Sequence, residues 1–417
     1  MSATRLQGWA VTLAAAGAAV VVFLDKALVG LVAQPLTQEL GISSTAYGAV
    51  GSASYVLNVV TCLVVGLAPR AVGPRWGLLV CGLLWAVGQA PAALAGTAGL
   101  LVVSRLVVGA AEGPAVPLAY TATYSWFPAR RRGLPAAVIT SGSSFAKIAL
   151  LPLVTLLVVH LGWRAGFVAV GVVALLWCAI WLAVGRMGPE AQAPAAERVR
   201  PDWRLMLRNP TMLACLAATF CQGALAAVVF TWLPSYFQAG LGFSQTTAGT
   251  LFALPSVMGV LALFAVGTVG DRMLRTGRTA RAARGLVGGV CLTLAGVLLM
   301  LLPAVDAPVA AVAVVVLAYG LSVTVNTVTY PMIGSLVPPS TLGNALAVLT
   351  AASGVAGIVS PLAAGVILDT RGDAAGGYDL AFLVFGAVQT VGGLLFWWFA
   401  RPERDAVRPP VAEEVAP

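Results

Sequence analysis

The sequence predicts an all-helical membrane protein with twelve spans, arranged as two six-helix bundles with both termini in the cytoplasm. Three observations predict this fold: the composition, the length of the apolar runs and the distribution of the basic residues. Of the 417 residues, 59% are hydrophobic and only 9% are charged, whereas a soluble domain carries about 25% charged residues. Lipid is therefore the natural solvent of the chain, and in lipid only helices or closed barrels satisfy the backbone.

The apolar runs are long and unbroken, which favours helices, because barrel strands alternate apolar and polar residues over about ten positions. Each run is close to the roughly 20 residues that a bilayer core requires. The predicted spans cover residues 10–32, 46–67, 77–96, 98–121, 135–159, 164–185, 211–233, 246–268, 285–303, 308–332, 344–367 and 379–399.

The arginines between these spans test the division. Nineteen fall on the side of the N-terminus, and only Arg164 and Arg371 fall on the other side. This asymmetry follows the positive-inside rule for an even number of spans with both termini inside. The formal net charge of +9 therefore reports topology and contact with anionic lipid, and not nucleic-acid binding.

The spans divide into two halves. Residues 1–185 and 211–400 hold six spans each, residues 186–210 form a polar cytoplasmic linker, and residues 401–417 form a charged, proline-rich cytoplasmic tail that is expected to be disordered. Shifted by 210 residues, the fifth span aligns with the eleventh, with seven identical pairs between Gly133/Gly343 and Ile148/Ile358. This pattern resembles the parallel repeats that build the two halves of major facilitator transporters.

Five ionisable residues fall inside the predicted spans at similar depth. They are Asp25 and Lys26 in the first span, Arg105 and Glu112 in the fourth, and Lys147 in the fifth. A charge at mid-bilayer costs about 2.5–3.5 kcal/mol on insertion scales, so we expect these side chains to share one cavity. Their sum is +1, and a cationic pocket favours a carboxylate. Asp25 and Glu112 can gain a proton, which would link anion binding to proton binding.

A structural alternative remains open for these charges. Asp25 would pair with a neighbouring cation and Arg105 with Glu112, only to hold the helices together. Lys147 fits this alternative least, because the internal repeat places it opposite Gly357, where a small residue suits close helix packing. We therefore expect Lys147 to face a cavity.

Neutral polar residues within the spans are further candidates for substrate contacts, although each could instead form a hydrogen bond between helices. They are Tyr55, Asn58, Gln222, Ser322, Thr324, Asn326, Tyr330 and Ser353. The six cysteines lie in apolar runs and predict no disulfide. The single histidine, His160, is expected at the surface. No metal-ligand spacing and no nucleophile–base set is present, so we expect neither a cofactor nor an enzyme.

Several motifs stand out along the chain. They are Leu24-Asp25-Lys26, Arg105 with Glu112, Trp126-Phe127-Pro128 before Arg130 to Arg132, Gly162-Trp163-Arg164, Thr231-Trp232-Leu233-Pro234, and Gly354 to Pro361. Together they resemble the anion:cation symporter family of the major facilitator superfamily. The resemblance implies transport of organic anions with protons. It also implies that Asp25 and Glu112 are coupling acids and that Lys26 and Arg105 are substrate cations.

Two departures accompany this resemblance. The cytoplasmic loop motif of the superfamily, G-x-L-A-D-R-x-G, implies a gate at Arg70, Asp271 and Arg272, but in its first copy Pro69 stands in place of the acid. The first-span cation of the family is usually arginine, and Lys26 lacks the bidentate fork of a guanidinium.

The main functional hypothesis is a monomeric secondary transporter of the bacterial inner membrane. It would import an organic carboxylate, taken as a monoanion, with protons as the coupling ion, so its partners would be a small organic anion, protons and membrane lipid. Two alternatives remain open: a proton-coupled efflux antiporter of drugs or metabolites, and a non-transporting membrane sensor. The segment Ser143 to Ile148 argues against the antiporter, because it lacks the Gly-Pro-rich motif of such proteins.

Overall fold

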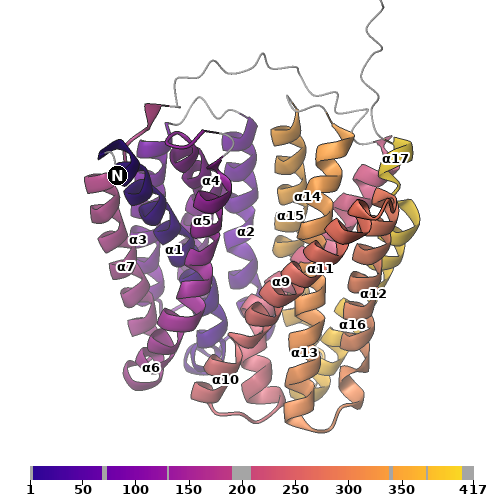
Figure 1. Cartoon of the computed structure of the whole chain (residues 1–417). Coiled ribbons are helices and arrows are strands. Elements are labelled where there is room, and N and C mark those ends of the chain that lie inside the picture. The colour runs from indigo at the N-terminus through magenta and orange to yellow at the C-terminus, as the bar shows by residue number, and fades with distance from the viewer. Residues whose placement is uncertain are drawn as a thin grey trace, which may run out of the picture.

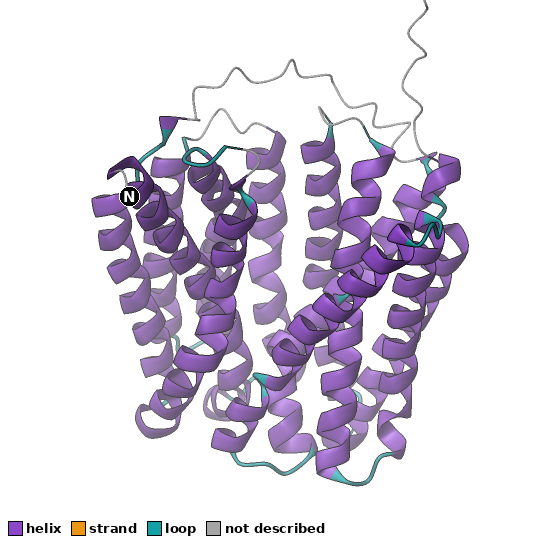
Figure 2. Ribbon diagram, viewed as in Figure 1, coloured by secondary structure: helices purple, strands orange, loops and turns teal. Residues whose placement is uncertain are grey.

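The computed structural model of the chain describes residues 3–67, 73–128, 131–189, 208–337, 341–371 and 374–405. Every regular element in these ranges is a helix (Figure 2). Twelve of the described helical segments are long and apolar enough to cross a membrane, and each overlaps one predicted span. The prediction of an all-helical fold with twelve spans is therefore confirmed.

The first group of helices lies on the left in Figure 1. It consists of α1 (Ala3–Leu40), α2 (Ser44–Leu67), α3 (Pro74–Ala93), α4 (Ala98–Tyr124), α5 (Gly133–Phe145), the π-helical turn η2 (Ala146–Leu150), α6 (Leu151–Leu161) and α7 (Trp163–Val184). The fifth span is formed by α5, η2 and α6 in succession.

The second group lies on the right in Figure 1. It consists of α9 (Pro210–Ser235), η4 (Tyr236–Gly240), α10 (Gln245–Leu251), α11 (Leu254–Arg275), η5 (Arg281–Leu286), α12 (Val287–Leu301), η6 (Leu302–Ala304), α13 (Pro308–Val323), α14 (Val325–Leu336), α15 (Leu342–Asp369), α16 (Ala374–Phe399) and the short α17 (Pro402–Asp405).

The helices end at two opposite sides of the bundle (Figure 1). The first residues of α1 and the last residues of α16 lie at the same end of the bundle, at the top in Figure 1. We call this end the termini side, and we call the opposite end, where α1 leads into α2, the far side. Gly162 makes the far-side turn between α6 and α7 with a φ of 83°, a left-handed conformation that favours glycine.

Helix α1 extends eight residues beyond the predicted end of its span, from 32 to Leu40. The apolar run ends near residue 32 because polar residues follow, but polar residues alone do not end a helix. Glu39 accepts a hydrogen bond from Trp163 Nε1 at 2.6 Å and forms an ion pair with Arg164. These contacts join the far-side end of α1 to the start of α7.

The two groups of helices touch closely along α2 and α15. A Cβ atom on Gly48 would lie 2.4 Å from the carbonyl oxygen of Pro361, and one on Gly365 would lie 2.3 Å from that of Ser44. Only glycine allows backbones to approach this closely, which is a usual device of packed membrane helices. Both contacts lie toward the far side, so the groups are joined there.

Candidate functional site

A cavity of about 580 Å³ lies between the two groups of helices. Residues of α1, α2, α3 and α4 line it on one side, and residues of α14 and α15 line it on the other. Its wall includes Val65, Pro74 and Gly343, which lie at the termini-side ends of their helices. The cavity thus reaches from the middle of the bundle toward the termini side. We refer to it as the central cavity.

The central cavity holds one ion pair, between α1 and α4. Lys26 Nζ lies 2.6 Å from Glu112 Oε2, and the two side chains are 21% and 1% exposed. The ammonium also lies 4.6 Å from the centre of the Tyr55 ring, within the range of a cation–π contact. The second carboxylate oxygen, Glu112 Oε1, is buried and has no hydrogen-bond partner among the described residues. Such an unpaired buried oxygen is costly, and a functional role is one explanation for its presence.

A second ion pair lies beside the first and is closed off from the cavity. Arg105 Nη1 donates to both carboxylate oxygens of Asp25, at 2.8 and 2.9 Å. Gln89 on α3 donates to Asp25 at 2.6 Å and accepts from Arg105 Nη2 at 2.9 Å, while Ser104 accepts at 3.0 Å. The side chains of Arg105 and Asp25 are 1% and 2% exposed. This network satisfies most of both charges internally.

The pairing differs from the structural alternative that the sequence left open. Arg105 pairs with Asp25 and Lys26 pairs with Glu112, whereas that alternative joined Arg105 to Glu112. Consecutive residues of a helix point about 100° apart. Asp25 and Lys26 therefore reach different partners on α4.

The expectation that five charges share one hollow is not met in this conformation. Lys26 and Glu112 line the central cavity, Asp25 and Arg105 are enclosed beside it, and Lys147 lines a separate cavity against α11. The Lys147 ammonium lies 4.8 Å from the centre of the Phe23 ring on α1. Equal depth along the membrane normal did not specify the direction of each side chain.

The neutral polar candidates also divide into two sets. Asn58 and Tyr330 line the central cavity, where Tyr330 is 45% exposed. Gln222 is buried in α9, and Asn326 is half-buried in α14. Ser353 packs against α9, since a Cβ atom on Gly223 would lie 2.4 Å from its hydroxyl oxygen. Neither Gln222, Asn326 nor Ser353 is part of the central cavity wall.

Two of the three predicted gate residues, Asp271 and Arg272, lie at the termini side. Asp271 and Arg272 are exposed near the end of α11, and neither forms an ion pair with another residue that the structure describes. Arg70 lies outside the described residues. His160, expected at the surface, is exposed at the far-side end of α6.

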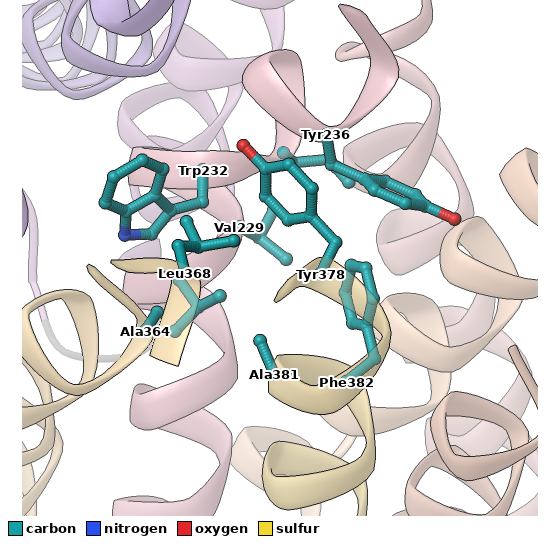
Figure 3. Close-up of a pocket in the computed structure, with 10 residues that line it drawn as sticks. Val229, Trp232, Tyr236, Ala364, Leu368, Tyr378, Ala381 and Phe382 are labelled. Atoms are coloured by element: carbon teal, nitrogen blue, oxygen red, sulfur yellow. The ribbon is translucent and has the colours of Figure 1, made fainter. Parts of the chain in front are cut away.

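Aromatic side chains pack at the far side, both within the second group and between the two groups. Tyr236 contacts Tyr378 and Phe382 with ring centres 5.3 and 4.8 Å apart, around a crevice of about 10 Å³ (Figure 3). That volume is at the limit for one water molecule, and every residue that lines the crevice belongs to the second group of helices. Tyr47 of α2 packs on Trp232 of α9 at 5.6 Å, which joins the two groups. The structure is thus open at the termini side and closed at the far side.

A polar contact reinforces this closure. Asp369, the last residue of α15, accepts hydrogen bonds from the backbone N–H groups of Ser44 and Thr45, at 3.0 and 2.7 Å. These are the first residues of α2, where N–H groups lack helical partners and a negative charge is stabilising. One carboxylate of the second group therefore caps a helix of the first group.

We expect Asp369→Ala to shift the protein toward a state that is open at the far side. A capping contact is worth about 1 kcal/mol, which corresponds to about a fivefold change in population. The measurement is the distance distribution between spin labels on the far-side ends of α2 and α15, in a background without the native cysteines. Ser43→Ala is the matched control, because Ser43 Oγ accepts from Ala46 N at the start of α2 and makes no hydrogen bond to another helix that the structure describes. Equal distributions in the Asp369→Ala variant and the control would contradict the assignment.

Three curated proteins of similar sequence are named as transporters. A probable sulfoacetate transporter of Cupriavidus necator is 28% identical over 394 residues, covering 90% of this chain and 89% of its own. A hexuronate transporter of Bacillus subtilis is 25% identical, covering 92% and 93%. An MFS-type efflux pump of Mycolicibacterium smegmatis is 28% identical, covering 92% and 91%.

The fold is also found among solved structures. A bacterial homologue of the human lysosomal transporter Spinster, in an inward-facing and unoccupied conformation, superposes with a TM-score of 0.82. The match covers 97% of this chain and 99% of the other, at 15% identity. The family model described as Major Facilitator Superfamily matches residues 15–330 and 284–417. The chain therefore belongs to the major facilitator superfamily and is a multi-pass membrane transporter rather than an enzyme.

Proposed function

We propose that this protein takes up an organic carboxylate together with protons across a bacterial cell membrane, by alternating access. The observation that carries the proposal is the Lys26–Glu112 pair in the wall of the central cavity. It is the one ion pair of the described residues that joins a partly exposed cation to a buried acid within the spans. Relatives named for sulfoacetate and hexuronate transport support an organic anion as the substrate.

The chemistry follows from competition for one ammonium group. When Glu112 is ionised, it occupies Lys26 at 2.6 Å. When Glu112 gains a proton, it no longer neutralises Lys26, and the ammonium is free to bind the carboxylate of a substrate. Proton binding and anion binding then favour each other, and this linkage is reciprocal. Asp25 is a weaker candidate for the coupling acid, because Arg105 and Gln89 already satisfy it.

The conformation suits the release step of such a cycle. If the termini side faces the cytoplasm, as the arginine distribution predicts, the central cavity opens to the cytoplasm and the far side is sealed. Asn58, Tyr330 and Thr350 supply neutral polar groups around the cavity from both groups of helices. A substrate that contacts both groups would favour closure of the termini side around it.

The proposal is tested by uptake of labelled organic acids into proteoliposomes with an imposed pH gradient. We expect uptake to rise when the outside is acidified and to stop when a protonophore collapses the gradient. Lys26→Gln is expected to lower the affinity for the substrate about 10–100-fold, because a charge-assisted contact is worth about 1.5–3 kcal/mol. Lys26→Arg should retain transport, since the charge is kept.

The matched control is Arg164→Gln on the far side. Its ion pair with Glu39 is exposed, and such pairs contribute little, so uptake should change less than about twofold. Uptake by Lys26→Gln at the wild-type rate and affinity would exclude Lys26 as the substrate cation. Uptake of the cognate acid that ignores pH and protonophore would exclude proton coupling.

Efflux is the second candidate, and the efflux pump of Mycolicibacterium smegmatis is the observation that favours it. The two functions differ in the effect of a pH gradient. An antiporter would accumulate its substrate in vesicles with an acidic interior, whereas a symporter would accumulate it when the exterior is acidic. Increased drug susceptibility of a deletion strain, without loss of growth on organic acids, would support efflux.

A further inference from the structure

The motif from Gly354 to Pro361 lies in α15 and forms the surface on which α2 packs. A Cβ atom on Gly354 would lie 2.3 Å from Val59 Cγ2. A Cβ atom on Gly357 would lie 2.2 Å from Cδ1 of the Tyr55 ring. Both distances are far below the roughly 3.5–4.0 Å of a carbon–carbon contact. The two glycines therefore give α15 a surface without side chains, and two side chains of α2 lie directly on its backbone.

Tyr55 belongs to a continuous contact face of α2. Gly48, Ser52, Tyr55 and Val59 are spaced four, three and four residues apart, which places them on one side of a helix. Ser52 Oγ accepts a hydrogen bond from the backbone N–H of Leu362 on α15 at 3.2 Å. This face joins the two groups of helices from the far side up to Val59.

The central cavity begins where this contact face ends. On α2 its wall starts at Asn58, and on α15 its wall extends only to Thr350. Neither Tyr55 nor Gly357 is part of the wall. The contact between them therefore lies just beyond the inner end of the cavity. In this conformation Tyr55 acts on a solute in the cavity only through a neighbouring side chain.

That neighbour is Lys26. Its ammonium lies 4.6 Å from the centre of the Tyr55 ring, and Lys26 itself lines the central cavity. One ring thus contacts a cation of α1 and the backbone of α15. While Glu112 is ionised, it also holds the ammonium at 2.6 Å. Once Glu112 gains a proton, the ring remains as an attractive partner, since a cation–π contact needs no negative charge.

The position of the ring depends on α15. While α2 and α15 are in contact, the backbone at Gly357 restricts the space that is open to the ring. When the helices part at the far side, as alternating access requires, the ring gains space and is no longer confined beside Lys26. The cation–π contact is then stronger in the far-closed state than in the far-open state. Because such linkage is reciprocal, the contact stabilises the far-closed state in return.

We propose that Tyr55 is a positioning residue of the transport cycle, which links the Lys26 ammonium to the contact between α2 and Gly357 of α15. The ring holds the ammonium in place at the central cavity while the far side is closed, and it releases the ammonium when the far side opens. The role of Lys26 in anion binding comes from the proposed function. The link between Lys26 and far-side closure goes beyond it and is present in the empty protein.

A double-mutant cycle on the purified, full-length protein without substrate tests this link. Far-side opening is measured as the distance distribution between spin labels on the far-side ends of α2 and α15, in a background without the native cysteines. Tyr55→Leu removes the ring and keeps an apolar side chain. We expect this substitution to raise the ratio of far-open to far-closed protein about three- to tenfold more when Lys26 is present than in the Lys26→Gln protein.

Further variants separate the ring from general packing. Tyr55→Phe keeps the ring, and the Tyr55 hydroxyl makes no hydrogen bond with another residue that the structure describes, so this variant should match the wild type within about twofold. Gly357→Ala keeps both Lys26 and Tyr55 but displaces the ring, and it should reproduce Tyr55→Leu, including the dependence on Lys26. Gly334→Ala in α14 is the matched control, because a Cβ atom there would meet open space.

The outcomes distinguish this inference from the proposed function. An equal effect of Tyr55→Leu with and without Lys26 would show that the ring only packs, and it would overturn the link. A Tyr55→Phe variant that behaves like Tyr55→Leu would overturn it as well. Neither result concerns a substrate, so the proposed uptake would stand. Uptake that is unaffected by Lys26→Gln, together with intact coupling in the cycle, would overturn the substrate role of Lys26 and leave the link standing.

Discussion

Replacement of Glu112 with glutamine is expected to abolish net proton-driven uptake and to preserve exchange of substrate for substrate. Glutamine imitates the protonated acid, so Lys26 stays free and the substrate still binds. The empty protein, however, must close around an unpaired ammonium that Glu112 would otherwise neutralise at 2.6 Å. A penalty of about 3 kcal/mol for a buried charge without its partner corresponds to a roughly hundredfold lower rate at which the empty protein returns to its outward-open state.

The measurement is net uptake and counterflow in the same proteoliposomes, at acidic and at neutral external pH. Net uptake by the variant should fall about a hundredfold and lose its dependence on pH, while counterflow stays within about threefold. Glu39→Gln is the matched control, because Glu39 lies on the same helix as Lys26 but is 49% exposed. A Glu112→Gln variant that keeps acid-stimulated net uptake would show that the proton is carried elsewhere.

The number, type and order of the spans could be predicted because they depend on one-dimensional properties. About 20 apolar residues cross a bilayer wherever they occur, and turns such as the one before Ala98 interrupt the hydropathy even when they are short. The same reasoning underestimated α1, since Glu39 and its polar neighbours continue the helix after the hydrophobic stretch ends. The length of a helix can therefore exceed the length of the segment that crosses the lipid.

For the charged residues, the sequence predicts the depth of each side chain but not its partner. Their depth could be read from their position in each span, and the structure pairs Lys26 with Glu112 and Asp25 with Arg105. Partner choice depends on the rotation of α1 against α4, which hydropathy does not specify. The same rotation turns Phe23 toward Lys147 and so separates that lysine from the central cavity.

Gln89 was missed because a neutral amide carries no charge signal. It hydrogen-bonds both Asp25 and Arg105, and it lies in α3, a helix without charged residues after Arg75. A lone amide in an otherwise apolar span is a usable signal, since such a group needs an internal partner in lipid. Tyr378 and Ser235, which hydrogen-bond each other at 2.6 Å on the far side, were missed for the same reason.

Arg105→Ala is expected to be among the most destabilising single substitutions within the first group of helices. It would leave Asp25 buried with only Gln89 as a partner, and loss of one member of a buried ion pair costs about 3–5 kcal/mol. Arg105→Lys should recover only part of this loss, because one ammonium nitrogen cannot reproduce the fork in which Nη1 contacts Asp25 while Nη2 contacts Gln89 and Ser104. The measurement is the free energy of unfolding in detergent, with Arg164→Ala as an exposed control that should cost less than about 1 kcal/mol.

The double variant Asp25→Leu/Arg105→Met distinguishes a positioning role from direct substrate contact. Apolar residues of similar volume can replace a buried ion pair with little loss of stability, but the buried amide of Gln89 loses both partners, which costs about 1–3 kcal/mol. This variant should therefore lose less stability than Arg105→Ala. Lys26 and Glu112 keep their contact in it. If Arg105 acts by holding α1 in register, the stable double variant should transport within about tenfold of the wild-type rate. A stable double variant that binds no substrate would mean that Arg105 reaches the substrate in another conformation. In the conformation described here, the Arg105 side chain is 1% exposed and does not line the central cavity.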